Sequence, residues 1–121
     1  MQIVNPRTME TPNARMDSLA TPSLGSTELC TWRVTMTAGT EGPVHAIDRE
    51  QVWMPVTGRF TVTADGRTEV VETGQSVILP AGETRQIRAH DGAVEAVVCM
   101  AVGGFASIPG GDDRIPLPWA Q

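Results

Sequence analysis

Two stretches of the sequence decide the fold: GTEGPVHAIDREQVWMPVTG over residues 39–58 and GQSVILPAGETRQIRA over residues 74–89. In both, short runs rich in Val, Ile, Thr and Trp lie between glycines and prolines. Such runs are typical of β-strands joined by tight turns, because β-branched and aromatic side chains fit a pleated surface while Gly and Pro form turns. The two stretches therefore predict an all-β protein.

The same pattern extends over the rest of the middle of the chain. It predicts strands at Glu28–Thr37, Val44–Ile47, Gln51–Val56, Arg59–Ala64, Thr68–Glu72, Ser76–Leu79, Arg85–Arg88 and Ala93–Ala101. The pair Asp65-Gly66 predicts a two-residue hairpin turn, because it supplies the positive φ angles that such a turn requires. No segment has apolar residues at helical spacing, so we expect no long helix. Many short strands with regular turns indicate a barrel or a sandwich.

A chain of 121 residues is long enough for one domain with a substantial core. We expect three parts. Residues 1–21 form an arm in which Gln2–Asn5 adds a strand to a sheet edge, in the same chain or in a partner subunit. Residues 22–102 form the barrel. Residues 103–121 form a tail, rich in Gly and Pro, whose apolar anchors Phe105 and Trp119 pack on the barrel or on a partner.

Charge and composition exclude several classes of function. With 9 Lys and Arg against 14 Asp and Glu, the net charge is −5 and no basic cluster occurs, so we expect neither a nucleic-acid partner nor a membrane surface. The apolar run Val94–Val102 is too short to cross a bilayer. The N-terminus lacks the apolar stretch of a signal peptide, which favours a cytoplasmic location. Cys30 and Cys99 lie in strand-like runs, where packed, reduced thiols are expected.

The spacing within the two quoted stretches resembles the two signature motifs of the cupin family, G-x(5)-H-x-H-x(3)-E-x(6)-G and G-x(5)-P-x-G-x(2)-H-x(3)-N. The framework positions that match are Gly39, Gly58, Gly74, Gly82 and Pro80. The resemblance extends over roughly residues 27–102. It implies a single-domain, jelly-roll β-barrel, commonly a homodimer, with a pocket in its mouth. In the family this pocket holds a divalent metal on the histidines and the glutamate of the motifs.

Three of the four positions that bind metal in the family carry other residues here. His45 matches the first ligand, but the other positions hold Ile47, Gln51 and Arg85. A transition metal needs several imidazole, carboxylate or thiolate ligands, and a fixed cation at position 85 repels it. We therefore expect no metal cofactor. The alternative is a divalent ion (Fe, Ni, Mn or Zn) held by His45 and Gln51.

The remaining pocket residues suit a small organic ligand. On a strand of period two, His45, Ile47, Gln51 and Trp53 share one face, with Arg85 and Ile87 expected opposite them. Arg85 is predicted to hold a carboxylate or enolate oxygen, Gln51 to orient it, and Trp53 to pack on a ring or chain. The isoleucines make the rest of the wall apolar. We expect an anionic or carbonyl-containing molecule as the ligand.

Three functions are compatible with this pocket. The first is a metal-independent enzyme of isomerase or cyclase type, in which His45 moves a proton and Arg85 stabilises negative charge. The second is a non-catalytic cupin that binds a ligand or has a structural role in an oligomer. The third is a metal-dependent dioxygenase or isomerase with atypical ligands. The presence of a single histidine in the pocket does not decide among these three functions.

Each candidate residue also has a purely structural interpretation. His45 can be an inert strand residue, and Arg85 can form an ion pair with Glu83 or Glu50. Trp32, Val34 and Met36 alternate on one strand face and are predicted core residues. His90 is expected in a solvated loop, Met54 and Met100 in packing contacts, and Trp119 against its own barrel or a neighbouring subunit.

Overall fold

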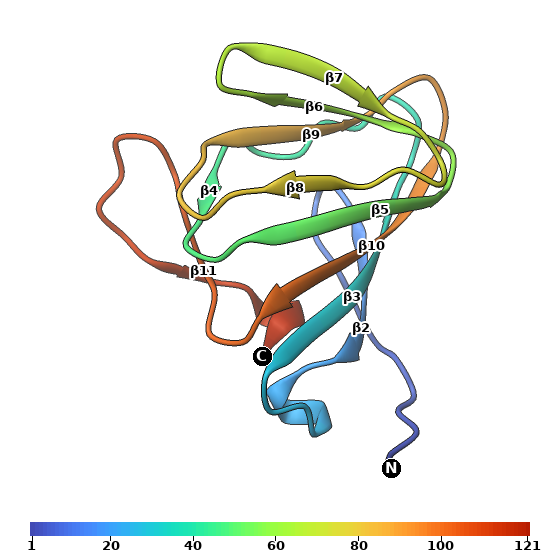
Figure 1. Cartoon of the computed structure of the whole chain (residues 1–121), viewed down its shortest axis with the longest axis vertical. Coiled ribbons are helices and arrows are strands. Elements are labelled where there is room, and N and C mark those ends of the chain that lie inside the picture. Colours follow the sequence, from blue (N-terminus) through green and yellow to red (C-terminus); the bar gives the residue numbers. More distant parts are fainter.

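The computed structural model describes all residues, 1–121, and contains an antiparallel six-stranded sheet as its largest element. The strand order in this sheet is β1 (Arg7–Glu10), β2 (Arg15–Ala20), β3 (Leu29–Met36), β10 (Val94–Ala101), β5 (Gln51–Thr57) and β8 (Val77–Leu79). Figure 1 shows β2, β3, β10, β5 and β8 side by side through the middle of the molecule.

Two three-stranded sheets complete the fold. One contains β7 (Arg67–Val71), β6 (Phe60–Ala64) and β9 (Arg85–Ala89), at the top of Figure 1, and the other β12 (Ile115–Pro116), β11 (Phe105–Ser107) and β4 (Ala46–Ile47). The only helical segments are the 3₁₀ turns η1 (Pro22–Leu24) and η2 (Pro118–Ala120). No helix is long and apolar enough to cross a membrane. The chain is thus an all-β jelly-roll, as the sequence predicts.

The core lies between the sheets and follows strict alternation. On β3 the inward residues are Cys30, Trp32, Val34 and Met36, and on β10 they are Val94, Ala96, Val98 and Met100. The strand register places Trp32, Val98 and Trp53 in one row across β3, β10 and β5. Trp53 meets the edge of Phe60 on β6, with 5.8 Å between ring centroids, which joins the large sheet to the smaller one.

The predicted hairpin between β6 and β7 is confirmed. Asp65 has φ 50° and Gly66 has φ 71°, the left-handed values that a two-residue primed turn requires. The bounds of the other predicted strands agree within about two residues, which is the usual scatter of strand ends, whereas β11 and β12 lie in the expected tail and were not predicted.

The N-terminal arm differs from the prediction. No strand forms at Gln2–Asn5; instead β1 begins at Arg7 and pairs with β2 of the same chain. The buried carboxylate of Asp17 holds this hairpin, since it accepts hydrogen bonds from Thr8 Oγ1 at 2.5 Å and from Arg33 Nη2 at 3.2 Å. The apolar pattern misses these strands because the buried residue that anchors them, Asp17, is an acid on the face opposite the core, across from Arg33.

The C-terminal tail packs on its own barrel. β11 pairs with β4 through Ala106 and Ile47, and Ser18 Oγ donates a hydrogen bond to the backbone oxygen of Trp119 at 2.6 Å. Phe105, the other expected anchor, lies under the guanidinium of Arg114 at 4.0 Å from the ring centroid and stays half-buried. Both predicted anchors are half-buried, and of the two Trp119 packs against the hydrophobic core.

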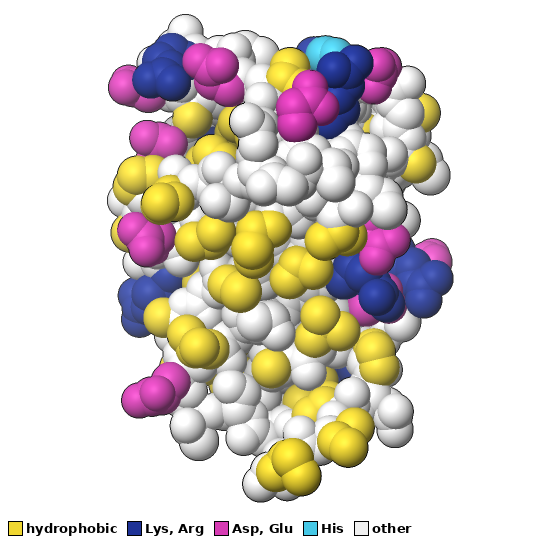
Figure 2. Space-filling view, turned by 45° about the vertical axis from the view of Figure 1, so that its right-hand side comes forward, with side chains coloured by type: hydrophobic (Ala, Val, Ile, Leu, Met, Phe, Trp, Pro, Cys, Tyr) yellow, Lys and Arg dark blue, Asp and Glu magenta, His cyan; other side chains and the backbone are white.

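The outer surface of the large sheet is apolar over β5, β8 and β10. Val52, Met54, Val56, Ile78 and Val97 point outward there; Ile78 is 61% and Val56 45% exposed. Figure 2 shows hydrophobic side chains gathered across the middle of the visible face, with charged groups toward its margins. We refer to these five residues as the outer apolar face.

Candidate functional site

The interior contains a cavity of about 440 Å³ with a mainly apolar lining. This volume lies within the range of pockets that hold small organic molecules, about 300–1,000 Å³. Five of the predicted pocket residues lie on its wall: His45, Ile47, Gln51, Trp53 and Ile87. The remaining lining comes from β3, from the hairpin tip between β1 and β2, and from the tail around η2.

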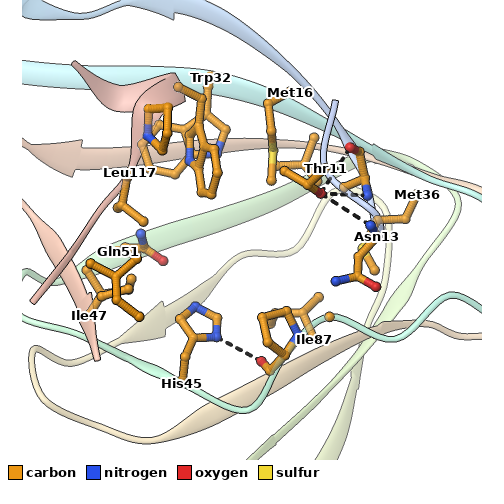
Figure 3. A pocket seen from close by; sticks show the side chains of 18 of the residues that line it. Thr11, Asn13, Met16, Trp32, Met36, His45, Ile47, Gln51, Ile87 and Leu117 are labelled. Atoms are coloured by element: carbon orange, nitrogen blue, oxygen red, sulfur yellow. Dashed lines mark hydrogen bonds between the residues drawn. The ribbon is translucent and has the colours of Figure 1, made fainter. Parts of the chain in front are cut away.

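His45 lies immediately before β4, and two backbone hydrogen bonds to Arg85 hold it in place. The backbone N–H of His45 donates to the backbone oxygen of Arg85 at 3.0 Å, and the backbone N–H of Arg85 donates to the backbone oxygen of His45 at 2.8 Å. The ring nitrogen Nδ1 lies 2.8 Å from the carbonyl oxygen of Pro43. Because a carbonyl only accepts, Nδ1 carries the proton of the neutral ring and Nε2 keeps a free lone pair. Figure 3 shows this second nitrogen facing the cavity.

The surroundings of His45 keep its ring neutral. Burial lowers the pKa of His45 below its ordinary value of 6.5, the nearby charge of Arg85 lowers it further, and the bond to Pro43 opposes both effects. The ring is therefore mainly uncharged at pH 7. A neutral imidazole with one lone pair directed into a pocket is a proton acceptor.

Gln51 is fixed by two donors that bind the same atom. Its Oε1 accepts from Arg85 Nη2 at 2.7 Å and from Trp53 Nε1 at 3.0 Å. Both partners are donors only, so they determine which end of the amide is oxygen. The Nε2 group has only Met100 Sδ at 3.5 Å, a weak acceptor. Gln51 is 2% exposed and lies on the cavity wall, so it presents an N–H donor rather than an oxygen ligand.

Arg85 does not lie on the cavity wall, which corrects the expectation of a direct contact with the ligand. The side chain is 1% exposed; besides Gln51, it donates through Nη1 to the backbone oxygen of Glu83 at 3.1 Å. No carboxylate pairs with it, so the expected ion pair with Glu83 or Glu50 is absent as well. The amide of Gln51 occupies the place between Arg85 and the cavity. Burial lowers the pKa of Arg85 to about 10, partly offset by Glu83, and it remains a cation at neutral pH.

Two tryptophans on the cavity wall were not among the predicted ligand-binding residues. The sequence predicts Trp32 as a core residue, and Trp119 as packing on its own barrel or on a neighbouring subunit. The indole Nε1 atoms of both are buried without a hydrogen-bond partner, whereas that of Trp53 is bound by Gln51. The inward parity of Trp32 was visible in the sequence, but no sequence signal places Trp119 inside the fold.

The four positions that bind metal in the family do not come together as a set of metal ligands in this chain. The structure brings no three His, Cys, Asp or Glu side chains together. Of the four positions, His45 supplies one lone pair, the oxygen of Gln51 is already bound by two donors, and Ile47 and Arg85 supply none. These side chains do not fit a divalent ion, which needs three or four such ligands.

The Cupin domain family model matches residues 32–103, which is more than half of the chain. The chain belongs to the cupin family. No curated protein sequence matches this cupin closely enough to count as a relative.

Several solved structures share the fold of this cupin. An RmlC-like cupin from Shewanella frigidimarina has a TM-score of 0.69 at 21% identity, over 80% of this chain and 84% of the other. KdgF from a Halomonas species has a TM-score of 0.72 at 15% identity, over 84% and 93%. The polyketide cyclase RemF from Streptomyces resistomycificus has a TM-score of 0.70 at 18% identity, over 93% and 77%. At these identities the similarity establishes the fold alone.

Proposed function

We propose that this cupin is a metal-independent proton-transfer enzyme of isomerase or cyclase type that acts on a small, largely apolar carbonyl compound. The observation that carries the proposal is the arrangement of His45. Its Nδ1 proton is held by Pro43 at 2.8 Å, so that the lone pair of Nε2 faces an apolar cavity. A neutral base in such surroundings is suited to remove a proton from carbon next to a carbonyl group.

The proton transfer needs no further reactant. His45 Nε2 takes the proton, the electron pair of the broken C–H bond moves toward the carbonyl, and an enolate forms. The N–H of Gln51 donates a hydrogen bond to the oxygen that gains charge. The cation of Arg85 lies 2.7 Å behind Gln51 Oε1 and polarises the amide in the same direction. Return of the proton from His45 to another carbon gives an isomer. Attack of the enolate carbon on a second carbonyl forms the C–C bond of a ring, and the resulting alkoxide takes the proton from His45.

Two further observations support this choice among the three functions. The metal-dependent alternative is disfavoured because the oxygen of Gln51 is already bound by Trp53 and Arg85. The cyclase type is favoured by the similar structure of RemF, which is a polyketide cyclase by name. Closure of a ring through an enolate requires the same proton transfer that His45 is placed to perform.

Proton exchange on a simple ketone tests the proposal directly. 2-Tetralone in D₂O exchanges its acidic C–H groups through an enolate, and NMR or mass spectrometry follows the incorporation of deuterium. We expect the wild-type protein to accelerate exchange, His45→Ala to abolish the acceleration, and His90→Ala to retain it. His90 is a suitable control because it contacts Thr61 and does not line the cavity.

The outcome also separates the alternatives. Binding of 2-tetralone without faster exchange contradicts catalysis and supports a non-catalytic ligand-binding cupin. Exchange that disappears after chelation and returns with Fe, Ni, Mn or Zn contradicts metal independence and supports the metal-dependent alternative.

A further inference from the structure

Asn13 is a polar residue of the cavity wall whose side chain has no partner within the protein. It lies in the turn between β1 and β2, and this turn forms part of the cavity lining. The residue is bonded through its backbone N–H, which donates to Thr11 Oγ1 at 3.3 Å, whereas its side-chain amide makes no hydrogen bond. The other asparagine of the chain, Asn5, does not line the cavity.

Both polar atoms of the Asn13 amide are accessible. The buried side-chain nitrogens without a hydrogen-bond partner belong to Arg7, Trp32 and Trp119, and no atom of Asn13 is among them. Asn13 itself is half-buried. Figure 3 shows its amide below the turn, directed toward the part of the cavity where Ile87 and His45 lie. The amide is therefore available to a molecule in the cavity.

The turn does not need an asparagine at position 13. Asparagine commonly stabilises turns through a hydrogen bond from its side chain to the backbone, or by adopting a left-handed backbone. Here Thr11 supplies the side-chain bonds, since its Oγ1 accepts from the N–H groups of Asn13 and Ala14 and donates to the oxygen of Ala14 at 3.2 Å. Asp65 is the one residue other than glycine with a left-handed backbone. Asn13 thus contributes neither stabilising effect to the turn.

The other polar side chains of the cavity wall are already engaged. Thr11 Oγ1 is bonded within its turn, and Gln51 Oε1 accepts two hydrogen bonds. The Nε2 atoms of His45 and Gln51 act in the proposed reaction. No Asp, Glu, Lys or Arg lines the cavity. Asn13 is therefore the wall residue whose accessible polar atoms have no role in that reaction.

We propose that Asn13 binds a hydroxyl group of the ligand and so selects among the carbonyl compounds that enter the cavity. Its amide offers an acceptor, Oδ1, and two donors on Nδ2, and a hydroxyl group both donates and accepts. A second carbonyl group would use the donors alone. A carboxylate or an ammonium group would be a charge in a cavity without a charged wall residue, which is costly.

The ligand class is therefore an apolar carbonyl compound that also carries a hydroxyl group. The placement of the carbonyl group at His45 and Gln51 rests on the proposed function. The hydroxyl group at Asn13 rests on the free amide alone.

Four matched pairs of 2-tetralones test this assignment. The members of each pair carry a hydroxyl or a methyl group, which are similar in size, at position 5, 6, 7 or 8 of the ring. Calorimetry gives the dissociation constants, and the ratio of the methyl to the hydroxyl value is the hydroxyl preference. Asn13→Leu keeps the branched shape of the side chain and removes its polar atoms. At the position of greatest preference, we expect this variant to reduce the preference about fivefold, since one net hydrogen bond contributes a factor of this order.

The matched control is Asn5→Leu, because Asn5 is exposed and lies outside the cavity. We expect it to leave the hydroxyl preference unchanged. His45→Ala should keep the preference while losing proton exchange, so that the recognition and catalytic proposals fail separately. A hydroxyl preference that is the same in the wild type and in Asn13→Leu at all four positions would refute the role of Asn13.

The side-chain NH₂ signals of the wild-type protein give a second measurement that depends on no variant. Through-bond NMR spectra assign the signals of Asn13 and Asn5. The hydroxyl compound of greatest preference should shift the Asn13 signals, and its methyl partner should shift them much less. The Asn5 signals should stay in place with both compounds. Equal shifts of the Asn13 signals with both members of the pair overturn the proposal.

Discussion

Replacement of Arg85 by methionine is expected to impair the site without destabilising the protein. The guanidinium is 1% exposed, has no carboxylate partner, and donates only to the neutral oxygens of Gln51 and Glu83. Methionine fills a similar volume with an apolar chain. The variant therefore removes a buried charge and leaves the packing of the barrel largely intact.

The magnitude follows from the charge and its hydrogen bonds. Burial lowers the pKa of Arg85 from its ordinary range to about 10, which corresponds to a burial cost of about 3 kcal/mol. Two hydrogen bonds from a cation restore a similar amount, at about 1.5–3 kcal/mol each. A methionine side chain in the same place adds about 1–2 kcal/mol of apolar burial. We expect the free energy of unfolding of Arg85→Met to lie within about 1 kcal/mol of the wild type.

Urea unfolding at pH 7, followed by tryptophan fluorescence, measures this difference. The control is Arg33→Met, because Arg33 Nη2 pairs with the buried carboxylate of Asp17 at 3.2 Å and its loss should cost about 1–2 kcal/mol. In the same preparations, Arg85→Met should slow proton exchange on 2-tetralone. A loss of more than about 3 kcal/mol in Arg85→Met would refute the reasoning, since it would make Arg85 a structural brace.

Three other predictions concern titration, the N-terminal hairpin and the outer apolar face. The His45 ring of the wild-type protein should titrate below 6.5 by NMR, and its pKa should rise in Arg85→Met. Between the lowered pKa of the folded protein and the ordinary pKa of the unfolded chain, the unfolded chain binds more protons, so the stability of the wild-type protein falls as the pH drops through this interval. Asp17→Asn should lower the free energy of unfolding by about 1–3 kcal/mol in urea, because the buried carboxylate accepts from two arginines and Thr8; no loss would show that β1 and β2 contribute little. If the chain forms the homodimer that the family resemblance implies, Ile78→Glu on the outer apolar face should yield monomers in light scattering, whereas an unchanged dimer would place the interface elsewhere.

The framework of the fold was predictable because it depends on local chemistry. Asp65-Gly66 specifies its turn through two positive φ angles, and the alternation on β3 and β10 specifies which side chains face inward. Both rules act within a few residues of the chain. The strands of the N-terminal hairpin were not predicted because their buried anchor, Asp17, is an acid that pairs with Arg33 on the face opposite the core, where no apolar alternation marks it.

The alternation of side chains along each strand predicts which residues of the site face inward, and little more. Gln51 and Trp53 lie on the cavity wall because they alternate on β5, whereas His45 reaches the wall from the segment before β4. For Arg85, strand parity predicts an inward side chain, as observed. Its position behind the cavity wall depends on the hydrogen bond to the Gln51 amide, which parity does not predict. Trp119 depends on a contact with Ser18, 101 residues away, and no local pattern encodes such a distance.

The cavity wall is formed by residues from the segment that the family model matches and by residues from the two terminal segments of the chain. His45, Gln51 and Trp32 belong to the segment matched by the family, residues 32–103, whereas the hairpin tip Thr11–Ala14 and Trp119 lie outside it. Two cupins with the same motifs can therefore differ in ligand preference through terminal segments that the motifs do not describe. Exchange of these segments between related barrels offers a route to new specificities, in which the proton-transfer residues stay constant while the recognition surface evolves.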